Sequence, residues 1–138
     1  MVRLLDLDDL PWLHDLFGRR YPKKYDAATT ERWFRAVVTK DALNMYAART
    51  DDAFLVALVA MLPWLPGEPE VNVIGICAEE DSPWQVIALL HSSIDWARKR
   101  NAARCRINTD TDYDVAPMAL RVGAREIRPR YEIDLRSG

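Results

Sequence analysis

The residues with the clearest chemical potential lie in one short run, Glu79–Gln85, which reads Glu-Glu-Asp-Ser-Pro-Trp-Gln. Of its three carboxylates, Glu79 and Glu80 are the candidates for a general base, a role that requires hydrogen-bond reach to the proton removed. The second half of the run also has a structural interpretation. Ser82 and Gln85 have the spacing of a capping box, with a proline between them at the first helical position.

The three carboxylates can also have a purely structural role. Acidic residues before a helix stabilise the positive end of its dipole in solvent, and we prefer this interpretation for Glu79, Glu80 and Asp81. The sequence contains no nucleophile elbow, P-loop or glycine-rich dinucleotide turn, and its Cys and His spacing suggests no metal site.

The chain around this run alternates strands and helices. We expect strands at 71–78 and 104–109 with a helix at 83–101 between them, then a short helix at 116–122 and a last strand at 126–135. A strand, crossover helix and second strand form a parallel pair. The helical apolar repeat expected to face the sheet comprises Val86, Leu89, Leu90, Ser93, Ile94 and Ala97.

The first half of the sequence supplies the remaining elements. We expect an opening strand at 2–7, a helix that Asp8 or Asp9 caps, a second helix at 26–40, and strands at 43–49 and 54–62. The apolar positions expected to be buried in the two helices are Leu10, Leu13, Leu16 and Phe17, then Trp33, Phe34, Val37 and Val38.

Length and composition narrow the class of protein. The 138 residues suit a single domain spanning 1–138. Nineteen basic and 21 acidic residues leave a net charge of −2, which offers no electrostatic footprint for nucleic acid or an anionic membrane. The first ten residues lack the apolar region of a signal peptide, so we expect a cytoplasmic protein. Cys77 and Cys105 lie in expected strands, where buried thiols are favoured over a disulfide.

The order of elements resembles the GNAT (GCN5-related N-acetyltransferase) fold over nearly the whole chain. The most similar part is the C-terminal half, where the residues before Val122–Ile127 look like the helix that precedes the family's Gly-Phe or Gly-Ala turn. The resemblance implies an α/β (α+β) domain with a mixed central sheet of about six strands and about four helices. GNAT-like proteins of this size are also encoded by tailed bacteriophages, which implies a virion as an alternative location.

In the family, acetyl-CoA binds between the splayed fourth and fifth strands, with its pyrophosphate on backbone N–H groups of a glycine-containing loop. Laid on this sequence, that loop falls at Glu79–Val86 and contains no glycine. Pro83 removes one N–H donor, Trp84 places a ring where phosphates would approach, and the three acids repel an anion. If the cofactor does bind, the resemblance places Cys77, Ser82, Trp84 and Gln85 around it.

The resemblance implies that this chain lacks some of the family's catalytic residues. Many family members protonate the departing thiolate with a Tyr four residues before the Gly, and here that position is Ala119. The family's Asn at the start of that helix corresponds to Asp112. Tyr113 or Tyr131 could replace the missing acid if the loop folds inward, and Glu79 is the candidate base.

Two functions from different classes remain open. In the first, which we favour, the protein has lost acetyl-CoA chemistry, needs no cofactor, and binds a protein partner or itself. One version of this function is a component of a phage virion. The expected interface residues are of the types that dominate interfaces: Arg19, Arg20, Tyr21, Trp64 and Leu65. In the second, the protein is an acetyl-CoA-dependent N-acetyltransferase with an atypical pyrophosphate loop.

Overall fold

The computed structural model describes residues 1–39, 44–60, 69–80, 82–107, 115–127 and 133. These residues form one five-stranded sheet, in the spatial order β1-β2-β3-β4-β5. The strands are β1 (Arg3–Leu4), β2 (Met45–Arg49), β3 (Ala53–Ala60), β4 (Glu70–Ala78) and β5 (Arg104–Ile107). The helices are a short 3-10 turn, η1 (Leu7–Asp9), followed by α1 (Leu10–Arg20), α2 (Ala27–Thr39), α3 (Pro83–Lys99) and α4 (Ala116–Arg121).

The sheet is mixed, as the sequence predicted. Strands β1 to β4 pair antiparallel, and β4 pairs with β5 in parallel, joined by α3. The parallel register begins at Glu70 opposite Arg104 and ends at Val73 opposite Ile107. The predicted parallel pair is therefore confirmed, although the described pairing uses only the first half of β4.

A bulge interrupts β4 directly after Val73, the last β4 residue with a described β5 partner. Val56 of β3 lies opposite Gly75, and the next residue, Ala57, lies opposite Val73, so Ile74 is an extra residue on β4. A bulge bends its strand and redirects the side chains beside it. The remainder of β4, Ile74–Ala78, has no β5 partner among the described residues.

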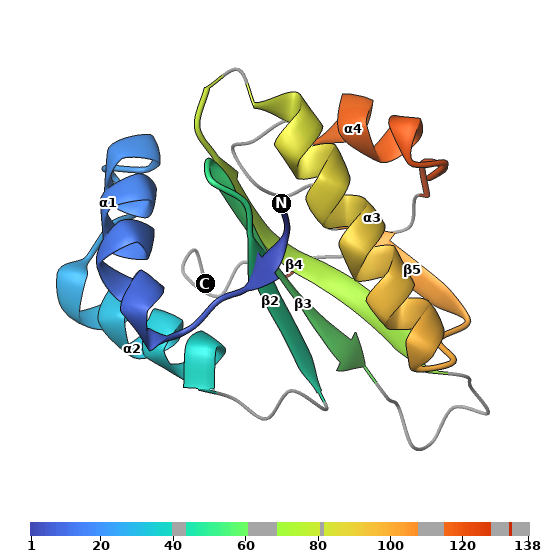
Figure 1. Ribbon diagram of the computed structural model, residues 1–138, viewed down its shortest axis with the longest axis horizontal. Helices are drawn as coiled ribbons and strands as arrows, with labels where there is room; N and C mark the ends of the chain where they lie inside the picture. The colour runs from blue at the N-terminus through green and yellow to red at the C-terminus, as the bar shows by residue number, and fades with distance from the viewer. Residues whose placement is uncertain (40–43, 61–68, 81, 108–114, 128–132, 134–138) are drawn as a thin grey trace.

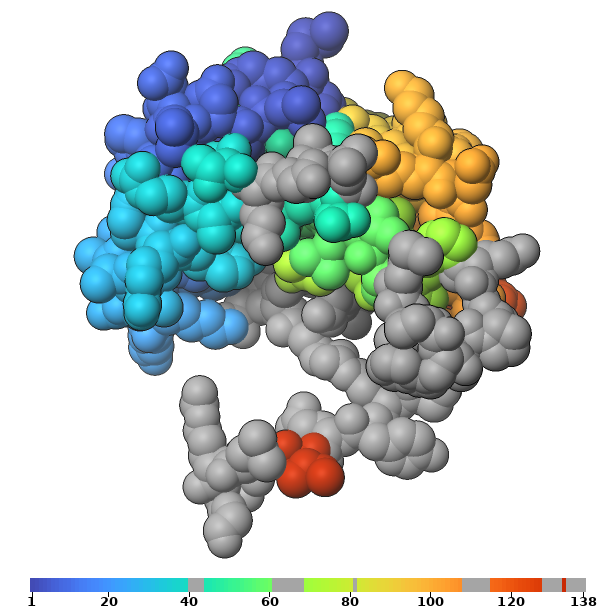
Figure 2. All heavy atoms as spheres, turned by 90° about the horizontal axis from the view of Figure 1, so that it is seen from below, coloured from blue at the N-terminus to red at the C-terminus, as the bar shows by residue number. Residues whose placement is uncertain are grey.

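Helices cover both faces of the sheet. Figure 1 shows α1 and α2 on one side and α3 and α4 on the other, and Figure 2 shows the blue and cyan residues of α1 and α2 against the green strands. Each face has its own apolar core. The core beneath α3 includes Leu55, Val71, Val73, Val86, Leu89 and Leu90; the core beneath α1 and α2 includes Leu13, Leu16, Phe34, Phe54, Val56 and Cys77.

Most of the helical residues that were predicted to be buried are buried. The α3 residues expected to face the sheet are buried apart from Ile94, which is half-buried. In α2, Phe34 and Val37 are buried as expected, whereas the side chain of Trp33 is 44% exposed and Val38 is half-buried. Trp33 lies at the edge of the apolar stripe of α2, so the helix covers only part of its ring and the rest is exposed to solvent.

Asp9 takes part in a helix cap, but on η1 and not at the start of α1. Asp6 and Asp9 form a capping box on η1, in which the Asp9 carboxylate accepts the Asp6 backbone N–H at 2.9 Å, and the Asp9 side chain makes no cap hydrogen bond to α1. The same buried carboxylate also accepts hydrogen bonds from Arg3 at 2.6 and 2.9 Å and from Arg49 at 2.9 Å. These arginines, from neighbouring strands, supply the paired charge that a buried carboxylate requires.

The predicted last strand lies mostly outside the described residues. Residues 124–127, which include its first two positions, have no regular structure, so the sheet has five described strands instead of about six. None of the helices in the described ranges has the length and hydropathy needed to cross a membrane.

Candidate functional site

The first turn of α3 is held by contacts that the sequence did not predict. Ser82 is buried, and its hydroxyl donates to the backbone carbonyl of Glu79 at 2.6 Å instead of capping the helix. The side chain of Gln85 likewise turns away from Ser82. The predicted capping box is therefore absent, because both side chains find partners in the loops that precede the helix.

Gln85 joins α3 to the turn between β2 and β3. Its amide oxygen accepts from the Thr50 hydroxyl and from the Asp52 backbone N–H, the latter at 2.8 Å. Its amide nitrogen donates to the Asp52 carboxylate at 2.7 Å. These three bonds commit both ends of the amide to the protein itself, so Gln85 is not available to a cofactor phosphate.

The acidic run meets the basic end of α1. Arg19 forms two hydrogen bonds with the Glu79 carboxylate, one of them at 3.0 Å, and Arg20 contacts Glu80 at 3.0 Å. The bonds from Arg19 lower the pKa of Glu79, against a smaller opposing effect of burial. Glu79 and Glu80 are each paired with an arginine 60 positions earlier, while the Glu80 side chain stays 81% exposed, as expected of a solvated residue before a helix.

The pairing also changes the expected roles of these residues. Arg19 and Arg20, predicted as interface residues, are engaged with Glu79 and Glu80 within the same chain. Glu79, the candidate base, has a lowered pKa, whereas a general base works best with a pKa near the operating pH. The ion pairs make Glu79 a weak proton acceptor.

Trp84 and Arg121 cover the outside of the same helical turn. The Trp84 ring is 65% exposed, and the Arg121 guanidinium lies 4.7 Å from its centroid. Ala119, at the position where the family places its acid, is buried and has no group that could protonate a thiolate. Tyr113, Asp112, Asp81, Trp64 and Leu65 lie outside the described residues.

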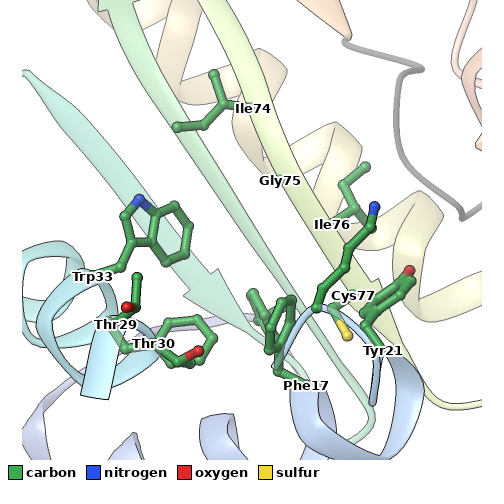
Figure 3. Close-up of a pocket in the computed structure, with 12 residues that line it drawn as sticks. Phe17, Tyr21, Thr29, Thr30, Trp33, Ile74, Gly75, Ile76 and Cys77 are labelled. Carbon is green, nitrogen blue, oxygen red and sulfur yellow. The ribbon is translucent and has the colours of Figure 1, made fainter. Parts of the chain in front are cut away.

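A separate groove lies on the other face of the sheet, between α2, the end of α1 and β4. Its volume is about 380 Å³, within the range of small-molecule sites. Figure 3 shows the Trp33 ring facing the strand that carries Ile74 and Gly75. The lining residues are Phe17, Tyr21, Lys24, Thr29, Thr30, Trp33, Phe34, Phe54, Ile74, Gly75, Ile76 and Cys77.

The bulge in β4 creates the floor of this groove. A Cβ added at Gly75 would point at the Trp33 ring, 4.0 Å from Cη2, so the missing side chain leaves space there. Ile74, the extra residue, belongs to the same face. Sequence reasoning missed the groove, although an isolated glycine within a strand pattern is a signal of a bulge.

Two residues with predicted roles line this groove. Tyr21, expected at a protein interface, and Cys77, expected near the cofactor, both belong to its wall. Burial raises the pKa of the Cys77 thiol to about 12, with smaller effects from Arg20 and Glu79. Cys77 is thus a neutral, unreactive thiol, and no disulfide joins it to Cys105.

Comparisons with known proteins identify the fold. No family model and no curated protein sequence matches the chain. Among solved structures, a probable acetyltransferase aligns with a TM-score of 0.78 at 17% identity, covering 98% of this chain and 97% of that one. A transcriptional regulator from Bacillus halodurans C-125 aligns with a TM-score of 0.80 at 14% identity, covering 98% and 99%.

A third similar structure is a ribosomal-protein-alanine N-acetyltransferase from Brucella melitensis biovar Abortus 2308. It aligns with a TM-score of 0.74 at 16% identity, covering 98% of this chain and 99% of that one. Alignment over both whole chains at such low identity demonstrates a shared fold and leaves the activity open. The chain has the fold of the GNAT acetyltransferases.

Proposed function

We propose that this GNAT-fold protein has lost acetyl-CoA chemistry and works by binding a protein partner. The observation that supports this most is the commitment of polar groups at the start of α3. Gln85 bonds to Thr50 and Asp52, Ser82 bonds to the Glu79 carbonyl, and Pro83 has no N–H to offer. A pyrophosphate arriving there would gain no hydrogen bond from Pro83 and would find the Ser82 and Gln85 side chains already bonded within the protein.

The argument from charge is weaker than the sequence suggested. Because Arg19 and Arg20 pair with Glu79 and Glu80, these acids repel a phosphate less than three unpaired carboxylates would. The hydrogen-bond commitment of the turn is the stronger barrier. Ala119 supplies no acid for a leaving thiolate, which further supports a role other than acetyl transfer.

The exposed residues beside this turn suit a protein contact. Trp84 and Arg121 form a stacked pair on the surface, and Trp and Arg are the residue types most enriched at the energetic centres of interfaces. We propose this pair as part of the contact surface, in place of Arg19 and Arg20. A virion location remains a prediction from the resemblance to phage proteins.

Calorimetric titration with acetyl-CoA tests the proposed loss of chemistry. We expect no binding at millimolar ligand, and micromolar affinity would contradict the proposal. Sedimentation velocity over a range of protein concentrations tests a second copy as the partner. Association that Trp84→Ala abolishes would support that version, whereas a monomer at all concentrations would exclude it and require a different protein as partner.

The alternative function is an acetyl-CoA-dependent N-acetyltransferase. It is favoured by one observation, the bulge at Ile74 in β4, the strand that pairs in parallel with β5, since the family binds its cofactor between these two strands. An assay for CoA release with a panel of amines separates the two functions. Amine-dependent turnover would establish the alternative.

A further inference from the structure

We propose that residues 98–106 bind an acidic segment of a protein partner. These residues, which we call the basic tip, comprise the end of α3, the turn at 100–103 and the first part of β5. Figure 1 shows α3 ending beside the start of β5, and Figure 2 shows the orange residues of this region gathered on the side away from α1 and α2. The basic tip lies at the opposite end of α3 from Trp84, so the proposal stands whether or not acetyl-CoA binds.

The basic tip concentrates positive charge in a chain that is acidic overall. It contains five cations and no carboxylate, whereas the whole chain has a net charge of −2. The cations are Arg98, Lys99, Arg100, Arg104 and Arg106. The side chains of Arg98, Arg104 and Arg106 are 76%, 59% and 48% exposed, and Lys99 is exposed as well. These charges therefore face solvent, where a partner can reach them.

The helix accounts for only part of this charge. Basic residues in the last turn of a helix stabilise the negative end of its dipole, which gives Arg98 and Lys99 a structural role. Arg104 and Arg106 belong to β5, after the helix has ended, and the dipole gives them no such role. The two arginines of β5 are therefore the residues that point most directly to a partner.

Arg104 and Arg106 form a pair on one face of β5. Cys105 and Ile107 pack against the core beneath α3. Because side chains alternate along a strand, both arginines point to the opposite face of the sheet. Residues two positions apart in a strand are separated by about 6.6 Å, so one extended acidic segment can contact both guanidinium groups.

Glu70 shows that this pair accepts a carboxylate. Glu70 lies opposite Arg104 in the parallel register, and one of its carboxylate oxygens is 3.4 Å from Arg106 and 3.9 Å from Arg104. A single carboxylate shared between two guanidinium groups balances only half of their charge. Since each guanidinium can hold a carboxylate through two parallel hydrogen bonds, the pair has donors for a second carboxylate.

Hydrogen bonds fix the turn that carries these side chains. Asn101 follows the helix in the left-handed conformation, with a φ of 57°, and the Ala102 backbone N–H donates to the Ala97 carbonyl at 3.1 Å. The Ala103 backbone N–H donates to the Pro69 carbonyl at 2.9 Å, which ties the turn to the residue before β4. A turn that is already ordered loses little conformational freedom when a partner binds.

A short acidic segment suits the basic tip better than a nucleic acid does. Duplex DNA carries one negative charge per about 1.7 Å of its axis and requires an extended basic surface. Outside residues 98–106, the chain has more acidic than basic residues, and these would repel a long polyanion. A segment with Asp or Glu at alternate positions needs only the arginines of β5 and the cations at the end of α3.

The test compares three probes by ¹H–¹⁵N NMR titration of the full chain. They are a short peptide of alternating Gly and Glu, the same peptide with Gln in place of Glu, and an oligothymidylate of the same charge as the Glu peptide. We expect the Glu peptide to shift the signals of residues 98–106 with a dissociation constant of about 1 mM at low salt, as a few exposed ion pairs allow. The Gln peptide should bind at least about tenfold more weakly, and the oligothymidylate should also bind more weakly than the Glu peptide.

Three variants locate the site. Arg104→Gln/Arg106→Gln should weaken the binding of the Glu peptide about five- to tenfold. The matched control, Arg32→Gln/Arg35→Gln, makes the same change in net charge at exposed positions of α2 and should change the affinity by less than about twofold. Glu70→Gln should tighten binding about two- to threefold, because it releases both arginines of β5 from their internal carboxylate.

The gain expected for Glu70→Gln separates the site from the effects of folding, since a damaged protein would lose affinity instead of gaining it. The proposal would be overturned if the Glu peptide caused no shifts at residues 98–106, or if the two double variants weakened its binding equally. Tighter binding of the oligothymidylate than of the Glu peptide would also overturn it and would assign the basic tip to a nucleic acid.

Discussion

Two hydrogen bonds join Gln85 to Asp52. The Gln85 amide oxygen accepts from the Asp52 backbone N–H at 2.8 Å, and the amide nitrogen donates to the Asp52 carboxylate at 2.7 Å. With the further bond from Thr50, this contact fixes the start of α3 to the β2–β3 turn. This contact explains why the Gln85 side chain, which was expected to cap α3 locally, bonds instead to residues of another turn.

We expect Gln85→Ala to lower the free energy of unfolding by about 1–3 kcal/mol, because Asp52 and Thr50 lose partners in a partly buried place. Urea unfolding measures the change. His91→Ala is the matched control on the exposed side of the same helix and should change stability by less than about 0.5 kcal/mol. Equal effects of the two variants would show that the Gln85 contacts contribute nothing.

Replacing residues 79–84 with a loop that contains Arg and Gly should create measurable affinity for CoA. The graft removes Pro83 and Trp84, supplies flexible backbone N–H donors, and releases Arg19 and Arg20 from their ion pairs. Calorimetry at low salt, where surface charges act most strongly, compares the graft with the wild type. Tight binding by the wild type would refute the exclusion of the cofactor.

Asp9 should make stability depend on acidic pH. Burial acts to raise the pKa of Asp9, but hydrogen bonds from Arg3, from the Asp6 backbone N–H and from Arg49 outweigh it and lower the pKa below its ordinary value of 3.8. The carboxylate therefore stabilises the fold above about pH 4, and this contribution is lost as the pH falls through the lowered folded pKa. In urea titrations from pH 6 to pH 3, the stability difference between wild type and Asp9→Asn should shrink. A stability difference that stays constant with pH would contradict the stabilising role of the ionised Asp9 carboxylate.

Cys77 should resist alkylation in the folded protein. Its side chain is 2% exposed, and burial holds the pKa of the thiol at about 12, so the reactive thiolate is scarce at pH 8. Mass spectrometry after iodoacetamide should find Cys77 unmodified in native protein and modified in urea. Because an unfolded thiol ionises near 9.0, stability should also fall as the pH rises from 9 toward 12. Rapid native labelling would show that the groove wall opens.

The fold could be predicted from sequence because its signals are local. The parallel pair follows from strand–helix–strand order, and the buried stripe of α3 follows from helical spacing at Val86, Leu89 and Leu90. Gly75 in an otherwise apolar strand also marked the bulge in principle. Such features depend on residues a few positions apart, which a single sequence displays directly.

The candidate sites could not be predicted because their contacts join distant segments. Glu79 and Arg19 are 60 positions apart, and Gln85 and Asp52 are 33 apart. Ser82 and Gln85 satisfied a local rule, yet Ser82 bonds to the Glu79 carbonyl three positions earlier and Gln85 bonds to the distant Thr50 and Asp52. Polar side chains near a helix start have several acceptable partners of similar energy, and tertiary placement decides among them.

A single layer of sheet backbone separates the α3 turn from the groove beside α2. Substitutions at the α3 turn touch the core that contains Leu89 and Val71, and substitutions in the groove touch the core that contains Phe34 and Phe54. A substitution on one face can therefore change the packing there while the side chains of the other core keep their contacts. A lineage of this fold could discard one ligand and refine recognition of another while its scaffold stays the same.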